Sequence, residues 1–416
     1  MKNHVLLIKW ALVVYVVCSL VSMATMSIGA ITLLLILVGV LGLKQTAAEL
    51  KHELEKPLSR ILFKASIVLT VVLALTILMG AVFPLKYAGR SVEINFIGVM
   101  VKTWYLFWPF AIVIALRRIS MADRLFVTRA WLVSFFVLSV IGILQYFLGW
   151  PRPQVIPGNE PYYHATVFLG HHLSVASVFI FPFFASLDLA IGHSLKTPCE
   201  LSKRFLWMAI GAGALTLFFS YSRMLWLALP IGILILLAIK LPLKRAVAMF
   251  APVIIAAAVL SQCDVVKRRM GDAIGIASRE DLWEANIEFF KARPLTGVGW
   301  HHNEQLSGHY LMEKYPGQSV FSGHGHNSVI DMLGGTGLIG TIAWCFWCLV
   351  VTWIIIKCFY RARHVNFSIG IACAWVVLHL NGLTQANFWE GKVMHQIALA
   401  VAWALLWSQE NEVNEK

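Results

Sequence analysis

Long apolar runs separated by short polar breaks dominate the hydropathy pattern of the chain. A helix that crosses a bilayer needs roughly 20 apolar residues, and about twelve runs approach that length. We place these predicted spans at about 5–23, 26–43, 61–84, 94–116, 131–149, 167–190, 205–220, 224–240, 246–262, 337–357, 366–383 and 393–408. The pattern therefore predicts an all-α bundle of about twelve transmembrane helices.

The composition agrees with a membrane environment. Hydrophobic residues make up 59% of the chain and charged residues 13%, about half the ~25% charged residues of an average soluble domain. A soluble fold has too little interior to hide so much apolar surface, which excludes a cytoplasmic enzyme, a secreted disulfide scaffold and a disordered chain. The strands of an outer-membrane barrel alternate apolar and polar residues, whereas these runs are continuously apolar. We therefore predict a polytopic helical membrane protein.

The basic residues indicate orientation. A formal net charge of +13 is also typical of nucleic-acid-binding proteins, but in a membrane protein basic loops first mark the cytoplasmic side. With the N-terminus inside, the short outer loops hold just Lys86, Arg90, Arg152, Arg223 and Lys392. The predicted topology has both termini in the cytoplasm, and no nucleic-acid partner is expected.

One long segment, 263–336, interrupts the succession of spans. It follows the ninth span on the outer side and contains His301, His302, His309, His324 and His326. Long connections are usually functional or disordered, and the many aromatic and glycine residues here favour an ordered loop. We divide the chain into helices one to nine (1–262), a catalytic loop facing the periplasm (263–336), and helices ten to twelve with a cytoplasmic tail (337–416).

A helical pattern opens in the first quarter of this loop. Ser278 and Asp281 fit a capping box, apolar residues follow at helical spacing, and Pro294 ends the pattern. Arg279 would then lie in the first turn, where a cation opposes the helix dipole unless it holds an anion together with the free N–H groups. The alternative is a solvated arginine paired with Glu280 or Asp281, and the sequence leaves both interpretations open.

Two further cations stand where basic residues are otherwise avoided. Arg223 follows Tyr221-Ser222 at an outer turn between two spans, where it either contacts lipid headgroups or grips a phosphate. Lys102 lies within the fourth span, about a third of the way in from the outer side by our reading of the sequence. An intramembrane lysine must snorkel, pair or face a polar cavity, and a role in holding a lipid phosphate is the functional alternative.

The sequence Gly323-His324-Gly325-His326-Asn327-Ser328 precedes the tenth span. Glycines let the backbone approach a ligand closely, and a neutral imidazole can take a proton from a hydroxyl near pH 7. His326 is therefore a candidate general base, with His324 and Asn327 as neighbouring candidates; the alternative is a structural histidine in a packed loop. The histidines lack the spacing of known metal motifs, and we predict no metal ion or other cofactor.

These motifs occur in a characteristic order. The order begins with an arginine after two outward-ending spans and continues with an arginine on the loop helix. It ends with a P-L-x-G-x-G turn (Pro294 to Gly299) and with His326-Asn327 before a glycine-rich span. In this order, between about 205 and 345, the chain resembles the O-antigen ligase and polymerase superfamily. Within it the chain is most similar to the lipopolysaccharide O-antigen ligases. One departure is Ser328, where the ligases often show an acidic residue, so the carboxylate partner of His326 is unassigned.

The resemblance implies a glycosyltransferase of GT-C-like architecture in the inner membrane of a Gram-negative bacterium. Such an enzyme moves a glycan from an undecaprenyl-pyrophosphate-linked donor to a lipid A–core acceptor at the periplasmic face, with inversion and without a metal ion. It implies that His326 is the catalytic base and that Arg223 and Arg279 hold the pyrophosphate, while Lys102, His324 and Asn327 are further candidates for the site.

Three other functions remain as alternatives. An O-antigen or exopolysaccharide polymerase uses the same donor but a second lipid-linked glycan as acceptor. A protein O-oligosaccharyltransferase would need a peptide-binding domain, which we do not recognise in this chain. A lipid-linked glycan flippase would need internal repeats and charges near the membrane midplane, and we find no clear example of either. The sequence gives no prediction of the donor sugar, the acceptor hydroxyl or the oligomeric state.

Overall fold

A computed structural model describes residues 2–156, 159–192, 201–262, 266–267, 273–362 and 367–410, and within these ranges the regular elements are helical, with two isolated β-bridges. The first helices are α1 (Lys2–Cys18), α2 (Met23–Leu41), α3 (Leu43–Glu55), α4 (Pro57–Val82), α5 (Phe96–Met100), the 3₁₀ helix η1 (Val101–Leu106), α6 (Trp108–Arg117), α7 (Met121–Leu148), α8 (His172–Val178) and α9 (Ile180–Ile191). The remaining helices are α10 (Lys203–Phe219), α11 (Arg223–Lys240), α12 (Leu243–Gln262), α14 (Ala273–Ala292), α15 (Asn303–Lys314), α16 (Ser328–Ala362), α17 (Ser368–Gly382) and α18 (Gly391–Glu410).

Each predicted span overlaps a helix of the structure. Within the described ranges, seven segments are long and apolar enough to cross a membrane, and two shorter apolar helices accompany them. The seven begin at Met23, Pro57, Phe96, Met121, His172, Arg223 and Ser328. The architecture is thus consistent with a polytopic helical membrane protein, and the number twelve stays a prediction.

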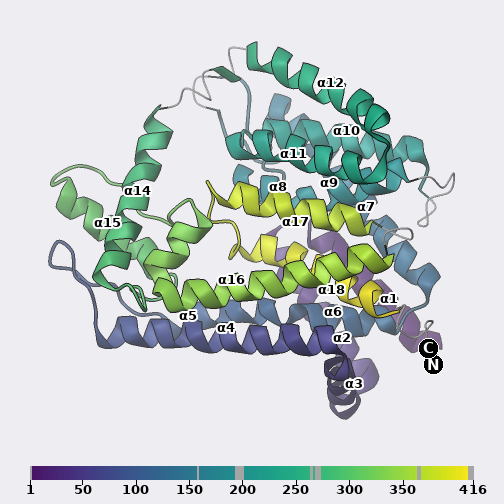
Figure 1. The fold of residues 1–416 in the computed structure, drawn as a ribbon, viewed down its shortest axis with the longest axis horizontal. Coiled ribbons are helices and arrows are strands. Elements are labelled where there is room, and N and C mark those ends of the chain that lie inside the picture. The colour runs from purple at the N-terminus through teal and green to yellow at the C-terminus, as the bar shows by residue number, and fades with distance from the viewer. Residues whose placement is uncertain are drawn as a thin grey trace.

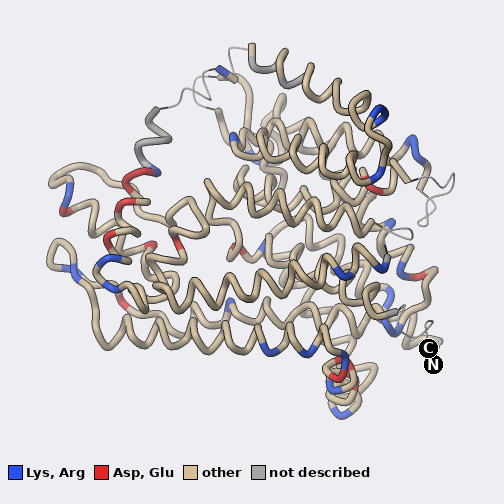
Figure 2. The backbone as a smooth tube through the Cα atoms, viewed as in Figure 1, with Lys and Arg blue, Asp and Glu red and all other residues tan. Residues whose placement is uncertain are grey.

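The long helices run roughly side by side, and the helices α14 and α15 lie together at one end of them (Figure 1). Figure 2 shows that Lys, Arg, Asp and Glu gather at the two ends of the bundle, while the zone between them is mostly uncharged. At the end opposite α14, Arg117 donates to Glu53 of α3 at 2.9 Å and Lys9 pairs with Asp123 at 2.8 Å. An uncharged zone between two charged ends is what a bilayer requires.

The interior of the bundle is formed by helices that are apolar on every side. The α8–α9 segment is entirely buried inside the protein, and α18 is buried over almost its full length. Peripheral helices such as α2, α4 and α12 expose large side chains, including Leu35, Val82 and Ile255. Helices that are hydrophobic all round belong in a core or in lipid, and this chain contains both kinds.

Two of the apolar segments are interrupted. The segment from Phe96 to Arg117 passes through the 3₁₀ turn η1, which contains Lys102, although the sequence predicted one continuous span there. Helix α16 is broken at Gly337, where φ is 60° and ψ is −164°. Irregular backbone at membrane depth is tolerated where it is buried in protein or lines a polar cavity.

The predicted capping box at Ser278 is wrong. Helix α14 already runs from Ala273, so the backbone at Ser278 is helical and cannot form an N-cap, which requires an extended conformation. The helix continues upstream because residues 273–277 are small or apolar and contain no proline. Arg279 consequently lies beyond the first described turn, and the helix-dipole argument for an anion there does not hold. The helix does end before Pro294, as predicted.

Candidate functional site

The glycine-rich loop turn and the break in α16 fit against each other. Val298 N donates to Gly334 O at 3.1 Å, and Gly299 N donates to Gly335 O at 2.8 Å. On the other side of the break, Leu338 N donates to Pro294 O at 2.8 Å. The turn therefore supplies backbone partners to the interrupted helix and fixes the segment that carries His326.

A buried amide network attaches this segment to α14 and α15. Asn303 Nδ2 donates to Asn286 Oδ1 at 2.8 Å and to Asp331 Oδ1 at 2.9 Å, and the same carboxylate oxygen of Asp331 accepts from Gly325 N at 2.8 Å. Asn286 and Asn303 are fully buried, so each lost bond would leave a desolvated polar group. The loop before His326 is thus held by side chains from two other helices.

His326 lies at the end of this loop in a strained conformation. Its φ is +44°, a region that non-glycine residues adopt rarely and at a cost of about 1–3 kcal/mol. Ala88 and Val167, which lie outside the motifs, also have positive φ, and so do His301 and Tyr221, with φ values of +62° and +58°. Strained residues are frequent at functional sites, and His326, His301 and Tyr221 adjoin or belong to the motifs found in the sequence.

Burial keeps the imidazole of His326 neutral. Desolvation, reinforced by the neighbouring His324, lowers its pKa from 6.5 to about 3; the bond to Gln385 opposes this shift, and the charges of Arg279 and His171 add to it. Nδ1 of His326 lies 3.2 Å from Oε1 of Gln385, and the ring of His324 lies edge-on with its centroid 4.3 Å away. A neutral ring can accept a proton, as a general base must.

Asn327 caps α16. Its Oδ1 accepts from Val329 N at 2.9 Å and from Ile330 N at 3.1 Å, while its Nδ2 donates to Leu383 O at 2.8 Å. These bonds match the role of an N-cap asparagine. The structure thus gives the asparagine of the H-N pair a structural part in orienting the chain beside His326.

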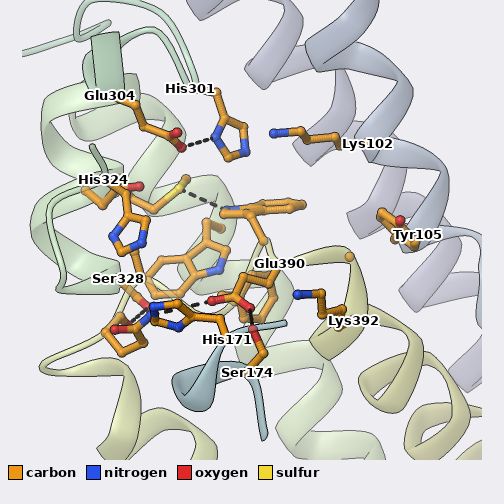
Figure 3. Close-up of a pocket in the computed structure, with 18 of the residues that line it drawn as sticks. Lys102, Tyr105, His171, Ser174, His301, Glu304, His324, Ser328, Glu390 and Lys392 are labelled. Atoms are coloured by element: carbon orange, nitrogen blue, oxygen red, sulfur yellow. Dashed lines mark hydrogen bonds and ion pairs between the residues drawn. The ribbon is translucent and has the colours of Figure 1, made fainter. Parts of the chain in front are cut away.

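A cavity of about 490 Å³ opens beside His324 (Figure 3). Its volume is within the range of ligand pockets, and its polar lining comes from several elements: Lys102, Tyr105, His171, Ser174, His301, Glu304, His324, Ser328, Asp331, Gln385, Glu390 and Lys392. Lys102 and Lys392 point into it from the side of η1 and α18, opposite the carboxylates of Glu304 and Glu390. Trp389, Phe388 and Trp344 supply aromatic surface.

The cavity contains one close acid–histidine pair. Nδ1 of His301 lies 2.6 Å from Oε1 of Glu304. Burial alone would raise the pKa of Glu304, but the bond to His301 and the electrostatic effects of His301, His324 and Lys102 together lower the pKa. Glu304 is therefore ionised at neutral pH. In the part of the chain that the structure describes, no group of three or more His, Cys, Asp or Glu side chains has the arrangement to hold a metal ion.

The predicted arginines do not line this cavity. Arg223 is the first residue of α11, and the preceding Ser222 donates to Asn381 Oδ1 at 3.3 Å. Arg279 lies on α14, close enough for its charge to lower the pKa of His326. Among the described residues that line the cavity are Lys102 and His324, but not His326, Arg223 or Arg279.

Several residues of the site were not singled out by the sequence motifs. Gln385 and Glu390 come from the connection between α17 and α18, and Asn303 opens α15. In the sequence Lys392 indicates only topology, whereas in the structure it lines the cavity. A signal existed for one pair: Glu390 and Lys392 stand on either side of Gly391, directly before the last apolar run. Charges beside a span in a protein with few charges are candidates for function.

Comparison with known proteins supports the family. No curated protein matches the chain. A family model described as O-antigen ligase matches residues 206–345, which cover most of α10, all of α11, α12, α14 and α15, and the break in α16. This match contains Arg223, Arg279 and His326, and it supports membership of the chain in the O-antigen ligase superfamily.

Proposed function

We propose that the protein transfers an O-antigen polysaccharide from undecaprenyl pyrophosphate to lipid A–core at the periplasmic face of the inner membrane. The observation that carries this proposal is a neutral, strained His326 beside a polar cavity at the α14–α15 end of the bundle. Both substrates are anchored in lipid, so their reacting groups must meet at the membrane face. A cavity between the helix ends and the covering loop suits such a meeting.

His326 takes the role of general base in this proposal. The acceptor hydroxyl transfers its proton to the imidazole while its oxygen forms a bond to the anomeric carbon. At the same time the bond between that carbon and the pyrophosphate oxygen breaks, with the oxocarbenium character usual in glycosyl transfer. In-line attack from the opposite face inverts the configuration, and undecaprenyl pyrophosphate leaves with the electron pair.

The low pKa of His326 makes it a weak base before the donor binds. A nearby negative charge favours the protonated imidazole and raises its pKa, so the pyrophosphate of the donor would move the base toward the working pH. The ring is thereby neutral at rest and becomes a better proton acceptor once the donor is present. General-base catalysis typically contributes about 10²–10⁴-fold to the rate.

Arg223 and Arg279 hold the pyrophosphate in this proposal. A guanidinium group binds phosphate oxygens with two parallel hydrogen bonds and stays charged at all accessible pH values. Positive charge placed where the leaving group becomes more negative stabilises the transition state, and no metal ion is needed for this. Lys102, which faces the cavity, adds a further cation near the lipid-linked substrates.

The proposal can be tested on lipopolysaccharide from a strain that lacks the gene. Bare lipid A–core with long glycan accumulating on undecaprenyl pyrophosphate is the expected result, and wild-type protein should restore the ladder. His326→Ala, Arg223→Ala and Arg279→Ala should fail to restore it although the proteins reach the membrane. Core that carries a single repeat unit would instead indicate a polymerase. An unchanged ladder would contradict both functions.

A further inference from the structure

The connection between α17 and α18 brings buried polar side chains next to His326. Gln385 is 2% exposed, and its backbone carbonyl accepts from Ser328 Oγ at 3.1 Å. Behind it, Glu390 accepts from Ser174 Oγ at 2.7 Å through Oε2. Its other carboxylate oxygen, Oε1, lies 3.5 Å from Gln385 Nε2. Three side chains therefore follow one another in the order His326, Gln385, Glu390.

The chemistry of the last member fixes the sense of the amide. An ionised carboxylate only accepts hydrogen bonds, whereas a glutamine amide has a donor end and an acceptor end. The NH₂ group of Gln385 must therefore face Glu390, even though the contact is long, and its oxygen must face Nδ1 of His326. Because an amide oxygen only accepts, Nδ1 must carry the proton. The lone pair of the neutral ring is then on Nε2.

We propose that Gln385 is a positioning residue that holds His326 as the Nδ1-protonated tautomer, and that Glu390 orients Gln385 through its amide group. This inference rests on the proposed function and supplies the acidic partner of His326 that the sequence left unassigned. The negative charge of Glu390 also favours the imidazolium that forms when Nε2 accepts the proton. The amide of Gln385 between them fixes the orientation of the ring and does not itself take the proton.

An amide in this position suits the charges around the ring. Those that affect His326 come from His324 in its own loop, Arg279 on α14 and His171 just before α8, and each opposes protonation. A carboxylate in direct contact with Nδ1 would attract the proton and favour a ring already charged before the acceptor arrives. Gln385 instead orients the ring and leaves it neutral, and the carboxylate of Glu390 lies on the far side of the Gln385 amide.

Three variants test this relay in purified protein that transfers glycan. Gln385→Leu removes the acceptor for Nδ1 and should lower kcat about 10²-fold, the loss expected from a misplaced base, with little change in the KM for the donor. Gln385→Glu keeps an acceptor in place and should recover most of that kcat at pH values above the raised pKa of the ring, where the imidazole is neutral. Its added negative charge should also move the acidic limb of the pH profile to higher pH. Glu390→Gln removes the charge that favours the imidazolium and replaces a group that only accepts by an amide that can also donate, so kcat should fall about 10-fold.

Gln396→Leu serves as the matched control. Gln396 is a buried glutamine on α18 that donates to Ser19 O and Oγ, both at 2.9 Å. Its replacement removes buried hydrogen bonds of similar kind but should leave the pH profile unchanged. Wild-type kcat in Gln385→Leu, or a Gln385→Glu variant with the same loss as Gln385→Leu and an unmoved pH profile, would overturn the relay. If the wild-type protein transferred no glycan, the proposed function itself would fail.

Discussion

Replacement of Gly337 by alanine should destabilise the junction between α16 and the loop turn. At φ 60° and ψ −164° the backbone is in a region that is essentially restricted to glycine, and strain of this kind costs about 1–3 kcal/mol. A Cβ atom would lie 2.4 Å from Leu295 C and 2.5 Å from Leu295 O. These are backbone atoms, so a change of rotamer cannot relieve the contact, and overpacking adds about 1–3 kcal/mol.

The two terms together predict a loss of about 2–6 kcal/mol, a large share of the ~5–15 kcal/mol that holds a typical protein folded. The hydrogen bonds from Leu338 N to Pro294 O and from Ile339 N to Leu295 O would lengthen or break. The loop that carries His326 would then lose its support, so activity should fall together with stability.

Thermal unfolding in detergent micelles measures the first effect, and a fall in Tm on the order of 5 °C is expected. Gly211→Ala is the matched control. Gly211 lies within α10, and a Cβ there would meet nothing within 4 Å, so alanine should leave Tm unchanged or slightly raised because of its higher helix propensity. An unchanged Tm and unchanged activity in Gly337→Ala would refute the interrupted helix as described.

Further perturbations test the surroundings of His326. Asn303→Leu removes the bonds to Asn286 and Asp331 and leaves buried polar groups without partners; a loss of about 2–4 kcal/mol should appear as a lower Tm. Arg279→Lys keeps the charge but not the bidentate geometry. The KM for the donor, measured at several salt concentrations, should therefore be higher in the variant than in wild type at each of them. The acidic limb of the pH profile of kcat/KM reports the pKa of the base in the free enzyme. Because the pKa of His326 is lowered to about 3, kcat/KM should not fall as the pH drops through 6.5. An acidic limb near pH 6.5 would contradict the buried, neutral ring. Asn327→Ala removes the N-cap of α16 and should lower stability by about 1 kcal/mol, with a smaller loss of activity than His326→Ala.

The helices were predictable from sequence to a large extent because lipid leaves a crossing chain little choice. Backbone groups in a bilayer must be satisfied within the segment, so an apolar run of sufficient length indicates a helix. The break at η1 was not predicted, because Lys102 is a single charge in an otherwise continuous apolar run and such a run indicates one unbroken helix. The start of α14 was also missed, because a local capping pattern at Ser278 gives no information about whether the preceding residues are already helical.

The residues of the site also differ in whether the sequence could indicate them. His326 and the glycines of the loop turn stand in short motifs, and a motif can be recognised without any tertiary structure. Gln385 contacts His326, Glu390 contacts Gln385, and Asn303 bonds to Asp331 of α16. Such contacts depend on how helices pack. Gln385 in particular carries no charge and belongs to no motif, so its role follows from the two groups that it joins.

The most direct measurement is glycan transfer by the purified protein in a membrane-like environment. The assay supplies a glycan on undecaprenyl pyrophosphate and lipid A–core as acceptor, with chelator present, and follows the formation of lipid A–core that carries the glycan. Wild-type protein should form this product, and folded His326→Ala protein with an unchanged Tm should form it at least about 10²-fold more slowly. Equal rates for the two proteins would contradict the account of His326 as the catalytic base.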